Sequence, residues 1–358
     1  MKIGIIGLPQ VGKKTIFRLL TGVDLSKEVS DSKDKVRFGI AKIRDDRFDK
    51  LVSLYSPKKK VPANIEFALL PKIGKETISS GEVFKAIFDV DAICHIVRVF
   101  KDESIFHINE TIDPIRDIEQ VNSELILNDL IFVEKRLEKI EKDSRKGLKK
   151  VRKEEEEILL KIKAHLDKEM PLRTLLLDKE EEKLLSGYQF ITKKGMMIVL
   201  NVGEEEIKNE KDLKQISEKY KDQKIEVMQV SAKIEEELSE FESEGERKAF
   251  LDELGIKESA LDKMTRLCYK TLGLISFFTV GKDEVREWTI KRDSTAPRAA
   301  GAIHTDLERG FIRAEVMKYD NLIEFGSESS VKKAGKYMVK GKDYIVEDGD
   351  IINIRFNV

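Results

Sequence analysis

The stretch "GLPQVGKKTIF" at residues 7–17 contains most of a phosphate-binding loop. It meets the pattern G-x-x-x-x-G-K-[ST] at Gly7, Gly12 and Lys13, and departs from it at the last position, where Lys14 replaces the Ser or Thr. In such a loop the glycines let the backbone wrap around an anion, the lysine reaches the terminal phosphates, and the hydroxyl binds Mg²⁺. Since an apolar run precedes the loop, the sequence predicts a strand, a phosphate loop and a helix from Lys13, with an altered metal side.

Length and composition describe a globular chain of several domains. At 358 residues, two or three domains are expected. The 66 basic residues nearly balance the 67 acidic ones, so a surface for nucleic acid has to be local. Cys94 and Cys268 lie far apart in apolar surroundings, which favours a reducing compartment over a disulfide. No run reaches the length of a membrane span. We therefore expect a cytoplasmic monomer with no membrane partner and no metal site built from cysteine.

Five apolar runs have the length and composition of buried strands. They are residues 3–6, 65–70, 92–100, 196–202 and 224–232. Helix-like stretches lie between them, and strands that alternate with helices are typical of a mostly parallel sheet. The sequence therefore predicts an α/β fold.

Between about residues 116 and 189 the pattern changes to helical periodicity. Apolar residues form two stripes joined at Gly147, and in the first stripe they recur at spacings of four and three. The stripes are Ile126, Leu130, Val133, Leu137 and Ile140, and then Leu148, Val151, Ile158, Ile162 and Leu166. Two such stripes predict an antiparallel helical hairpin with coiled-coil packing.

The predicted hairpin has a basic tip, "KDSRKGLKKVRK", at residues 142–153. Basic residues at the end of a projecting element suit contact with a phosphate backbone. The candidate RNA-binding residues are Lys146, Lys149, Lys150 and Arg152. The alternative is a solvated helical turn, which the mixture of Lys and Glu along the rest of the hairpin would fit.

From about residue 273 the sequence is rich in strand-like runs. "LISFFTVGKDEVREWTI" predicts a strand, a turn and a second strand, and "DYIVEDGDIINIRFNV" predicts another pair around Asp348-Gly349. A small β-rich domain of about 85 residues is expected there. Nothing in it has the pattern of a catalytic site.

Several long stretches together identify a family. "GLPQVGKKT" resembles the "GLPNVGKST" loop of the Obg-like ATPases (the YchF family), and residues 95–130, 295–315 and 341–350 also resemble that family. The resemblance covers nearly the whole chain in the same order. It implies a Ras-like P-loop core at 1–115 and 190–272, a helical-hairpin insertion at 116–189, and a C-terminal TGS domain of β-grasp fold at 273–358. It also implies a preference for ATP and association with ribosomes, through the hairpin and the TGS domain.

The resemblance also suggests which residues read the base. Guanine-specific relatives use N-K-x-D, whereas this family has N-x-x-E, which "NVGE" matches at Asn201 and Glu204. "SAK" at residues 231–233 resembles the loop that closes over the base. The expected nucleotide-binding residues are Gly7, Gln10, Val11, Gly12, Lys13, Lys14, Thr15, Asn201, Val202, Glu204, Ser231 and Ala232. ATP is expected over GTP, and a merely solvated polar cluster at 201–204 is the alternative.

Three departures from the family lie on the metal side of the site. Besides Lys14, alignment with the family's D-x-x-G puts Leu69 at the Asp and Lys72 at the Gly, and residues 30–35 hold no Thr for the switch position. An ammonium about 4 Å from a divalent ion costs roughly 8 kcal/mol at an effective dielectric of about 20. We expect Lys14 to supply a tethered charge in place of Mg²⁺, so that nucleotide binds without metal. The alternative is a loop that only turns the chain, with Lys14 in solvent.

His107 matches a family histidine proposed to orient the attacking water, which makes it the one catalytic candidate. A hydrogen-bonded loop histidine with no catalytic role is the alternative.

Three functions remain open at this point. The first, and the one we favour, is a nucleotide-binding, ribosome-associated protein with weak or lost hydrolysis. The second is an active ATPase of the family. The third is an RNA- or ribosome-binding adaptor that needs no nucleotide.

Overall fold

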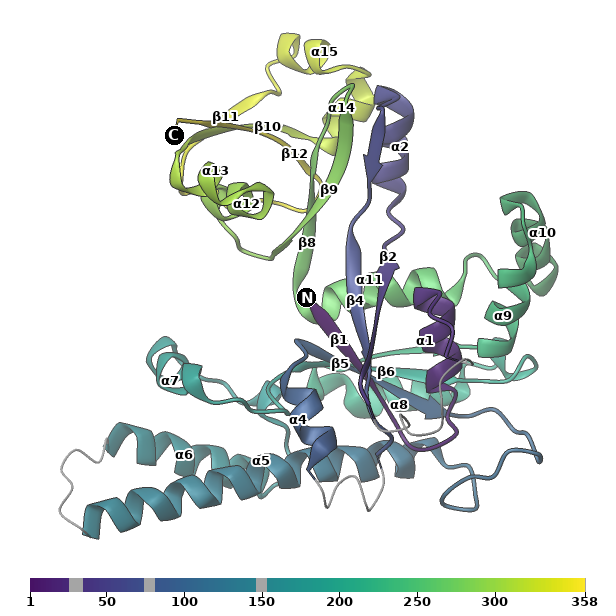
Figure 1. Cartoon of the computed structure of the whole chain (residues 1–358), viewed down its shortest axis with the longest axis vertical. Coiled ribbons are helices and arrows are strands. Elements are labelled where there is room, and N and C mark those ends of the chain that lie inside the picture. The colour runs from purple at the N-terminus through teal and green to yellow at the C-terminus, as the bar shows by residue number, and fades with distance from the viewer. Residues whose placement is uncertain (26–34, 74–80, 146–152, 358) are drawn as a thin grey trace. The chain divides into compact units, whose positions relative to one another are not determined.

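The computed structural model describes residues 1–25, 35–73, 81–145 and 153–357 (Figure 1). The chain forms two compact units. Unit 1 comprises Met1–Ile40 and Glu66–Met264, and unit 2 comprises Ala41–Ile65 and Thr265–Val358. Among the described residues, no helix is both long and apolar enough to cross a membrane.

Unit 1 is built on a six-stranded sheet with the order β2-β4-β1-β5-β6-β7 (Figure 1). The strands are β1 (Lys2–Ile6), β2 (Arg37–Lys42), β4 (Asn64–Leu69), β5 (Ala92–Arg98), β6 (Gly195–Asn201) and β7 (Glu226–Val230). From β4 to β7 every neighbouring pair is parallel. Their carboxyl ends therefore meet at one edge, which is where ligands bind in such sheets. The five predicted strands and the α/β class are confirmed, and β2 is an additional edge strand.

Helices connect these strands. They are α1 (Lys13–Thr21), α4 (Glu82–Phe88), α5 (Pro114–Arg145), α6 (Lys153–Leu166), α7 (Lys179–Leu184), α8 (Lys211–Tyr220), α9 (Ala232–Glu240) and α10 (Glu244–Leu254). Short 3₁₀ turns are η2 (Leu172–Thr174), η3 (Leu185–Gly187), η4 (Glu206–Lys208) and η5 (Lys221–Gln223). Two helices start with reciprocal capping boxes, Asp178 with Glu181 in α7 and Ser243 with Glu246 in α10. The next helix along the chain, α11 (Ala260–Leu272), contains the boundary between the two units.

The predicted helical hairpin is α5 and α6, which lie side by side (Figure 1). The apolar stripes form one cluster, and its buried members are Ile126, Val133, Ile140, Ile158, Leu159, Ile162, Leu166, Leu172, Leu185 and Phe190. Leu130 and Leu137 pack against this cluster, while Leu148 and Val151 lie outside the described residues. Helical periodicity therefore identified the packed faces correctly.

A buried carboxylate attaches the hairpin to the segment that returns to the sheet. Asp129 on α5 accepts hydrogen bonds from the backbone N–H groups of Ile191 and Thr192 at 3.0 and 2.8 Å, and from the Thr192 hydroxyl at 2.7 Å. Thr192 Oγ1 in turn accepts from the Leu172 N–H at 3.1 Å. Burial raises the pKa of Asp129, and these hydrogen bonds oppose that shift.

Unit 2 is built on a second sheet with the order β11-β10-β12-β8-β9-β3. The strands are β3 (Lys59–Val61), β8 (Leu274–Thr279), β9 (Glu284–Lys291), β10 (Phe311–Lys318), β11 (Met338–Lys340) and β12 (Asp350–Phe356). The helices are α2 (Asp46–Tyr55), α12 (Ala296–Ile303), α13 (Thr305–Arg309), α14 (Tyr319–Phe325) and α15 (Glu328–Lys333). β8 and β9 form the predicted antiparallel pair. The β-rich C-terminal part is thus confirmed.

The second predicted strand pair, around Asp348-Gly349, is wrong. Only β12 is a strand there, and it pairs with β10 and β8. The preceding run makes a single bridge between Ile345 and Thr295. The reason is the short connection at Asp348, whose carboxylate accepts from the Ser276 N–H at 2.9 Å and pairs with Arg47 at 2.8 Å.

Residues 41–65, which the sequence-based division assigned to the core, group by contact with unit 2. β3 pairs with β9 in parallel. The buried Glu287 carboxylate accepts from the Ala63 N–H at 3.2 Å and from the Ser276 hydroxyl at 2.6 Å. Phe48 and Leu51 of α2 pack in the apolar cluster of the second sheet. The boundaries drawn from the sequence stay a prediction for the functional domains.

Candidate functional site

The glycine-rich loop follows β1 and leads into α1. Gly7 and Gly12 have φ values of 148° and 92°, which few other residues adopt. A Cβ at Gly7 would overlap the Ile96 carbonyl oxygen, and a Cβ at Gly12 would overlap the Asn201 side chain. Gln10 also has a positive φ, 58°. The loop therefore has the tight left-handed turns that aim successive backbone N–H groups at an anion.

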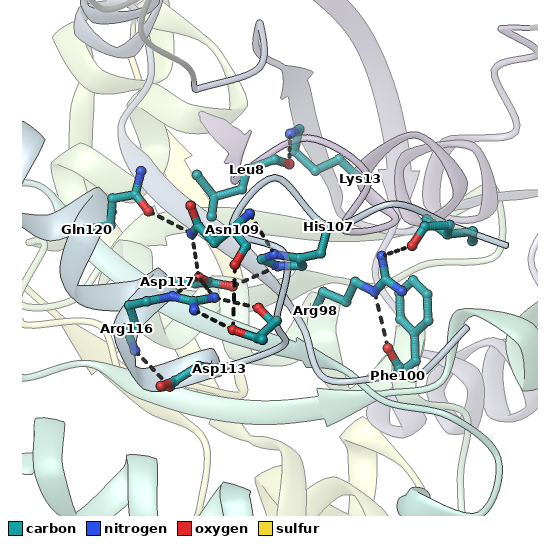
Figure 2. Close-up of polar contacts among 12 residues, drawn as sticks. Leu8, Lys13, Arg98, Phe100, His107, Asn109, Asp113, Arg116, Asp117 and Gln120 are labelled. Atoms are coloured by element: carbon teal, nitrogen blue, oxygen red, sulfur yellow. Dashed lines mark hydrogen bonds and ion pairs between the residues drawn. The ribbon is translucent and has the colours of Figure 1, made fainter. Parts of the chain in front are cut away.

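Lys13 lies folded back onto this loop. Its ammonium group is buried and donates to the Gly7 carbonyl oxygen at 2.5 Å. It also donates to the Leu8 carbonyl oxygen at 2.7 Å (Figure 2). Burial, helped by the positive charges of Lys72 and Lys14, lowers the pKa of Lys13 to about 7. A phosphate group at the loop would offset these effects, because its negative charge favours the charged form of a desolvated ammonium group.

Asn201, at the carboxyl end of β6, joins the phosphate loop to the predicted base-side loop. Its Nδ2 donates to the Val11 carbonyl at 3.1 Å, and its Oδ1 accepts from the Ala232 N–H at 3.1 Å. The side chain is 3% exposed. Asn201 therefore fixes the phosphate loop and the predicted base-side loop relative to each other.

The other base-side residues lie around this connection. The Val202 N–H donates to the Val230 carbonyl at 2.8 Å. Ser231 caps α9, where its hydroxyl accepts from the Ile234 N–H at 3.4 Å. Glu204 is exposed, and its carboxylate lies 2.8 Å from the ammonium group of Lys233. Of this set, Glu204 has the one carboxylate that could accept hydrogen bonds from a base edge.

On the metal side of the loop, a lysine and a leucine stand where oxygen ligands for Mg²⁺ are expected. Lys14 is exposed on the first turn of α1, and Thr15, the next residue, is half-buried. Leu69 ends β4 and is 6% exposed, opposite Ile5 of β1. Mg²⁺ prefers near-octahedral oxygen ligands. An ammonium group and an isobutyl group provide none, so these residues do not fit a magnesium site. In the part of the chain that the structure describes, no group of three His, Cys, Asp or Glu residues could hold a metal ion.

His107 is buried in the loop between β5 and α5, and its ring points toward Asp117 (Figure 2). Its Nε2 lies 2.9 Å from Asp117 Oδ2, and its Nδ1 accepts from the Asn109 N–H at 3.1 Å. Because Nδ1 accepts, the ring proton is on Nε2. Asp117 also accepts from Asn109 Nδ2 at 3.0 Å and from Arg116 at 2.9 Å. Nδ1 is thus hydrogen-bonded, whereas Nε2 and Asp117 Oδ2 lie close together without the geometry of a hydrogen bond. The catalytic role of His107 stays a prediction.

Arg98 fixes the start of the same loop. Its buried guanidinium donates to the backbone carbonyls of Phe100, Asp102 and Ile105 at 3.1, 3.0 and 3.0 Å (Figure 2). Sequence reasoning missed Arg98 and Asp117, since a charged residue in an apolar run or at a helix start is usually exposed. The four candidate RNA-binding residues, Lys146, Lys149, Lys150 and Arg152, lie outside the described residues.

A glycine-rich loop between the central strand of a parallel sheet and α1, tied to a second loop by Asn201, defines a P-loop protein of the nucleotide-binding α/β class. Comparisons with known proteins narrow this class. The chain is 42% identical to the "Ribosome-binding ATPase YchF" of Bacillus subtilis (strain 168), with 99% of each chain covered. It is 38% identical to "Obg-like ATPase 1" of Caenorhabditis elegans, with 100% of this chain and 92% of the relative covered.

Structural comparison agrees. The structure titled "Structure of the Schizosaccharomyces pombe YchF GTPase" matches with a TM-score of 0.84 at 32% identity, covering 99% of this chain and 97% of that one. Residues 274–357 match the family model YchF-GTPase_C, described as "Protein of unknown function (DUF933)". The chain belongs to the YchF family of Obg-like ATPases.

Proposed function

We propose that this protein is a ribosome-associated nucleotide-binding protein that prefers ATP to GTP and hydrolyses it weakly or not at all. The observation that carries the proposal is the contrast between the two sides of the P-loop. The phosphate side is complete, with Gly7, Gly12 and a Lys13 ammonium bonded to the loop. The metal side has Lys14 and Leu69 in place of oxygen ligands.

Loss of hydrolysis follows from that contrast. Phosphoryl transfer in P-loop proteins depends on a metal that bridges the β- and γ-oxygens and neutralises the charge that develops on them. Lys14 and Leu69 offer no ligand for such an ion. The phosphate side needs no metal to bind, because backbone N–H groups and Lys13 supply its contacts.

The preference for ATP rests on Glu204. Where a guanine-reading aspartate would stand, this chain has a longer carboxylate that lies 2.8 Å from Lys233. The Glu204 carboxylate, which would have to accept from the guanine N–H groups, is therefore already paired with Lys233. The names of the relatives, which include ribosome-binding ATPases, support the same nucleotide and a ribosomal partner.

Two measurements on the purified protein test this function. Calorimetric titration with ATP and with GTP should give binding for both and tighter binding for ATP, and Lys13→Met should remove it. Phosphate release with saturating ATP should stay near the uncatalysed rate. Rapid phosphate release would instead support an active ATPase, and lack of any nucleotide binding would support an adaptor.

The ribosomal partner needs its own test. Co-sedimentation with ribosomes should decrease steeply with salt, because contacts to phosphates release counterions. Replacement of Lys146, Lys149, Lys150 and Arg152 together by Gln should weaken co-sedimentation and its salt dependence. A flat salt response would contradict RNA contact by the hairpin tip.

A further inference from the structure

A third lysine, Lys72, lies beside the phosphate loop, and its place follows from the pairing of β4 with β1. Leu69 is opposite Ile5, and the Leu70 N–H donates to the Ile5 carbonyl at 3.1 Å. The chain then turns toward the loop, where the Ile73 N–H donates to the Gly7 carbonyl at 3.4 Å. Lys72, one residue earlier, is exposed at this position.

The Gly7 carbonyl is where two segments of the site meet. It accepts from the Ile73 N–H at 3.4 Å and from the Lys13 ammonium at 2.5 Å. The backbone next to Lys72 and the ammonium of Lys13 therefore share one acceptor atom. Lys14 follows Lys13 directly at the start of α1. Lys72 and Lys14 thus lie on either side of Lys13 along the loop, and the charges of both act on it.

The electrostatics of Lys13 agree with this arrangement. Its pKa is lowered first by burial, and then by the positive charges of Lys72 and Lys14, in that order. The effect of Lys72 exceeds that of Lys14, although Lys14 is the sequence neighbour. Two positive charges therefore act on Lys13 in the free loop, and an anion of high charge would offset their effect.

We infer that this site selects a nucleoside triphosphate free of divalent metal, with Lys14 and Lys72 bound to the phosphate oxygens that Mg²⁺ would otherwise contact. This inference rests on the proposed nucleotide binding and adds Lys72 as a residue that determines specificity. Mg²⁺ cancels part of the negative charge of a triphosphate, and it would have to lie beside these two ammonium groups. Mg²⁺ therefore competes with Lys14 and Lys72 for the phosphate oxygens and does not act as a cofactor.

The ligand of this site is a chain of phosphates. Three ammonium groups and a row of backbone N–H groups recognise a chain of phosphates by its charge, whereas Asn201 and Glu204 lie on the base side. Affinity should therefore increase from the monophosphate to the triphosphate. Inorganic tripolyphosphate, which has no base, should compete with ATP in the absence of metal.

The test is calorimetric titration of the full-length protein with ATP, in EDTA and in excess Mg²⁺. Wild type should bind at least about tenfold more tightly in EDTA, since charged hydrogen bonds of this kind correspond to a tenfold to hundredfold effect. Lys72→Gln should weaken binding in EDTA by about tenfold and reduce the difference between the two conditions. Lys72→Gly, which restores the family residue, should act in the same direction. Lys14→Ser combined with Leu69→Asp should make Mg²⁺ increase the affinity.

Lys193→Gln is the matched control. Lys193 is exposed and directly precedes Lys194 and the amino end of β6, so it lies at the sheet edge opposite the phosphate loop. It should leave both affinities unchanged. Thermal unfolding of each variant checks that the fold is kept.

The outcomes separate the two proposals. Tighter binding of ATP in Mg²⁺ than in EDTA, or an unchanged affinity of both Lys72 variants, would overturn this inference and leave nucleotide binding in place. No binding of ATP or tripolyphosphate in either condition would overturn the proposed function as well.

Discussion

Asn201 Nδ2 lies 3.1 Å from the carbonyl oxygen of Val11, although 190 residues separate them in the chain. The same side chain accepts from the Ala232 N–H. One buried amide therefore links the phosphate loop to the start of α9. The link depends on the parallel order of β1, β5 and β6, which brings the carboxyl ends of these strands to one edge.

Replacing this amide should affect both stability and binding. Asn201→Ala leaves the Val11 carbonyl and the Ala232 N–H without their partner. We expect the free energy of unfolding to fall by about 2–3 kcal/mol. ATP affinity should fall at the same time, because the phosphate loop loses its connection. Urea unfolding and ATP titration measure the two effects.

Asn128→Ala is the control for this change. Asn128 is a half-buried amide on α5, and no hydrogen bond of its side chain is found among the described residues. It should change neither quantity. An Asn201→Ala protein with wild-type stability and affinity would show that the two loops are held by other contacts.

Nucleotide binding should be coupled to protonation of Lys13. In the free protein the pKa of Lys13 is lowered to about 7, so above that pH the ammonium is largely deprotonated. A bound phosphate favours the charged form and raises this pKa. Binding at about pH 8.5 should therefore take up close to one proton, and affinity should fall by up to tenfold per pH unit above pH 7.

Calorimetry in two buffers of different ionisation enthalpy measures this uptake. The phosphates themselves are fully ionised there, since their second pKa is about 6. The stability of the free protein should depend on pH in the opposite direction from ATP affinity. Between about pH 7 and 10.5 Lys13 binds more protons in the unfolded chain than in the native one, so its contribution to stability should rise with pH in that window. Zero proton uptake at about pH 8.5 would mean that Lys13 stays charged in the free loop.

Much of this fold could be predicted because it depends on local pattern. The stripe from Ile126 to Ile140 needs only helical spacing, and the buried strands need only apolar runs. The contribution of residues 41–65 to unit 2 could not be predicted in this way, since it depends on Glu287 accepting from the Ala63 N–H across 224 positions. The strand β2 was missed because Arg37–Lys42 alternates over six residues, of which only Ala41 and Gly39 are buried.

The site residues also differ in whether local sequence pattern or distant contacts determine their roles. The glycines and Lys13 were predictable, since their chemistry follows from a contiguous motif. The connecting role of Asn201 was not, because its partners lie in two distant loops. Arg98 and Asp117 were missed for a related reason. Arg98 donates to the Ile105 carbonyl and Asp117 Oδ1 accepts from Asn109, and only the folded loop brings these groups together.

Asp129 should be the main attachment of the hairpin to the core. Asp129→Ala leaves the N–H groups of Ile191 and Thr192 buried without an acceptor. We expect a loss of about 3 kcal/mol in the free energy of unfolding, and more protease cleavage between residues 114 and 194. Asp129→Asn should lose less, because one oxygen remains. Asp222→Ala, which removes an exposed carboxylate in η5, is the control and should be neutral. Equal stability of Asp129→Ala and wild type would show that the apolar contacts of α5 alone hold the hairpin.

His107 and Asp117 should be strongly coupled in stability. Both are almost fully buried at 2.9 Å, so a double-mutant cycle with Ala at each position should give an interaction energy of about 1–3 kcal/mol. His304 and Asp306 are the matched control, because they form an exposed pair at 3.4 Å and should give less than about 0.5 kcal/mol.

If His107 is held by Asp117 in this way, His107→Ala should lower stability and leave ATP affinity unchanged. A coupling as small as that of the exposed pair, or a loss of phosphate release in a fully stable His107→Ala protein, would contradict the structural role and support the catalytic one.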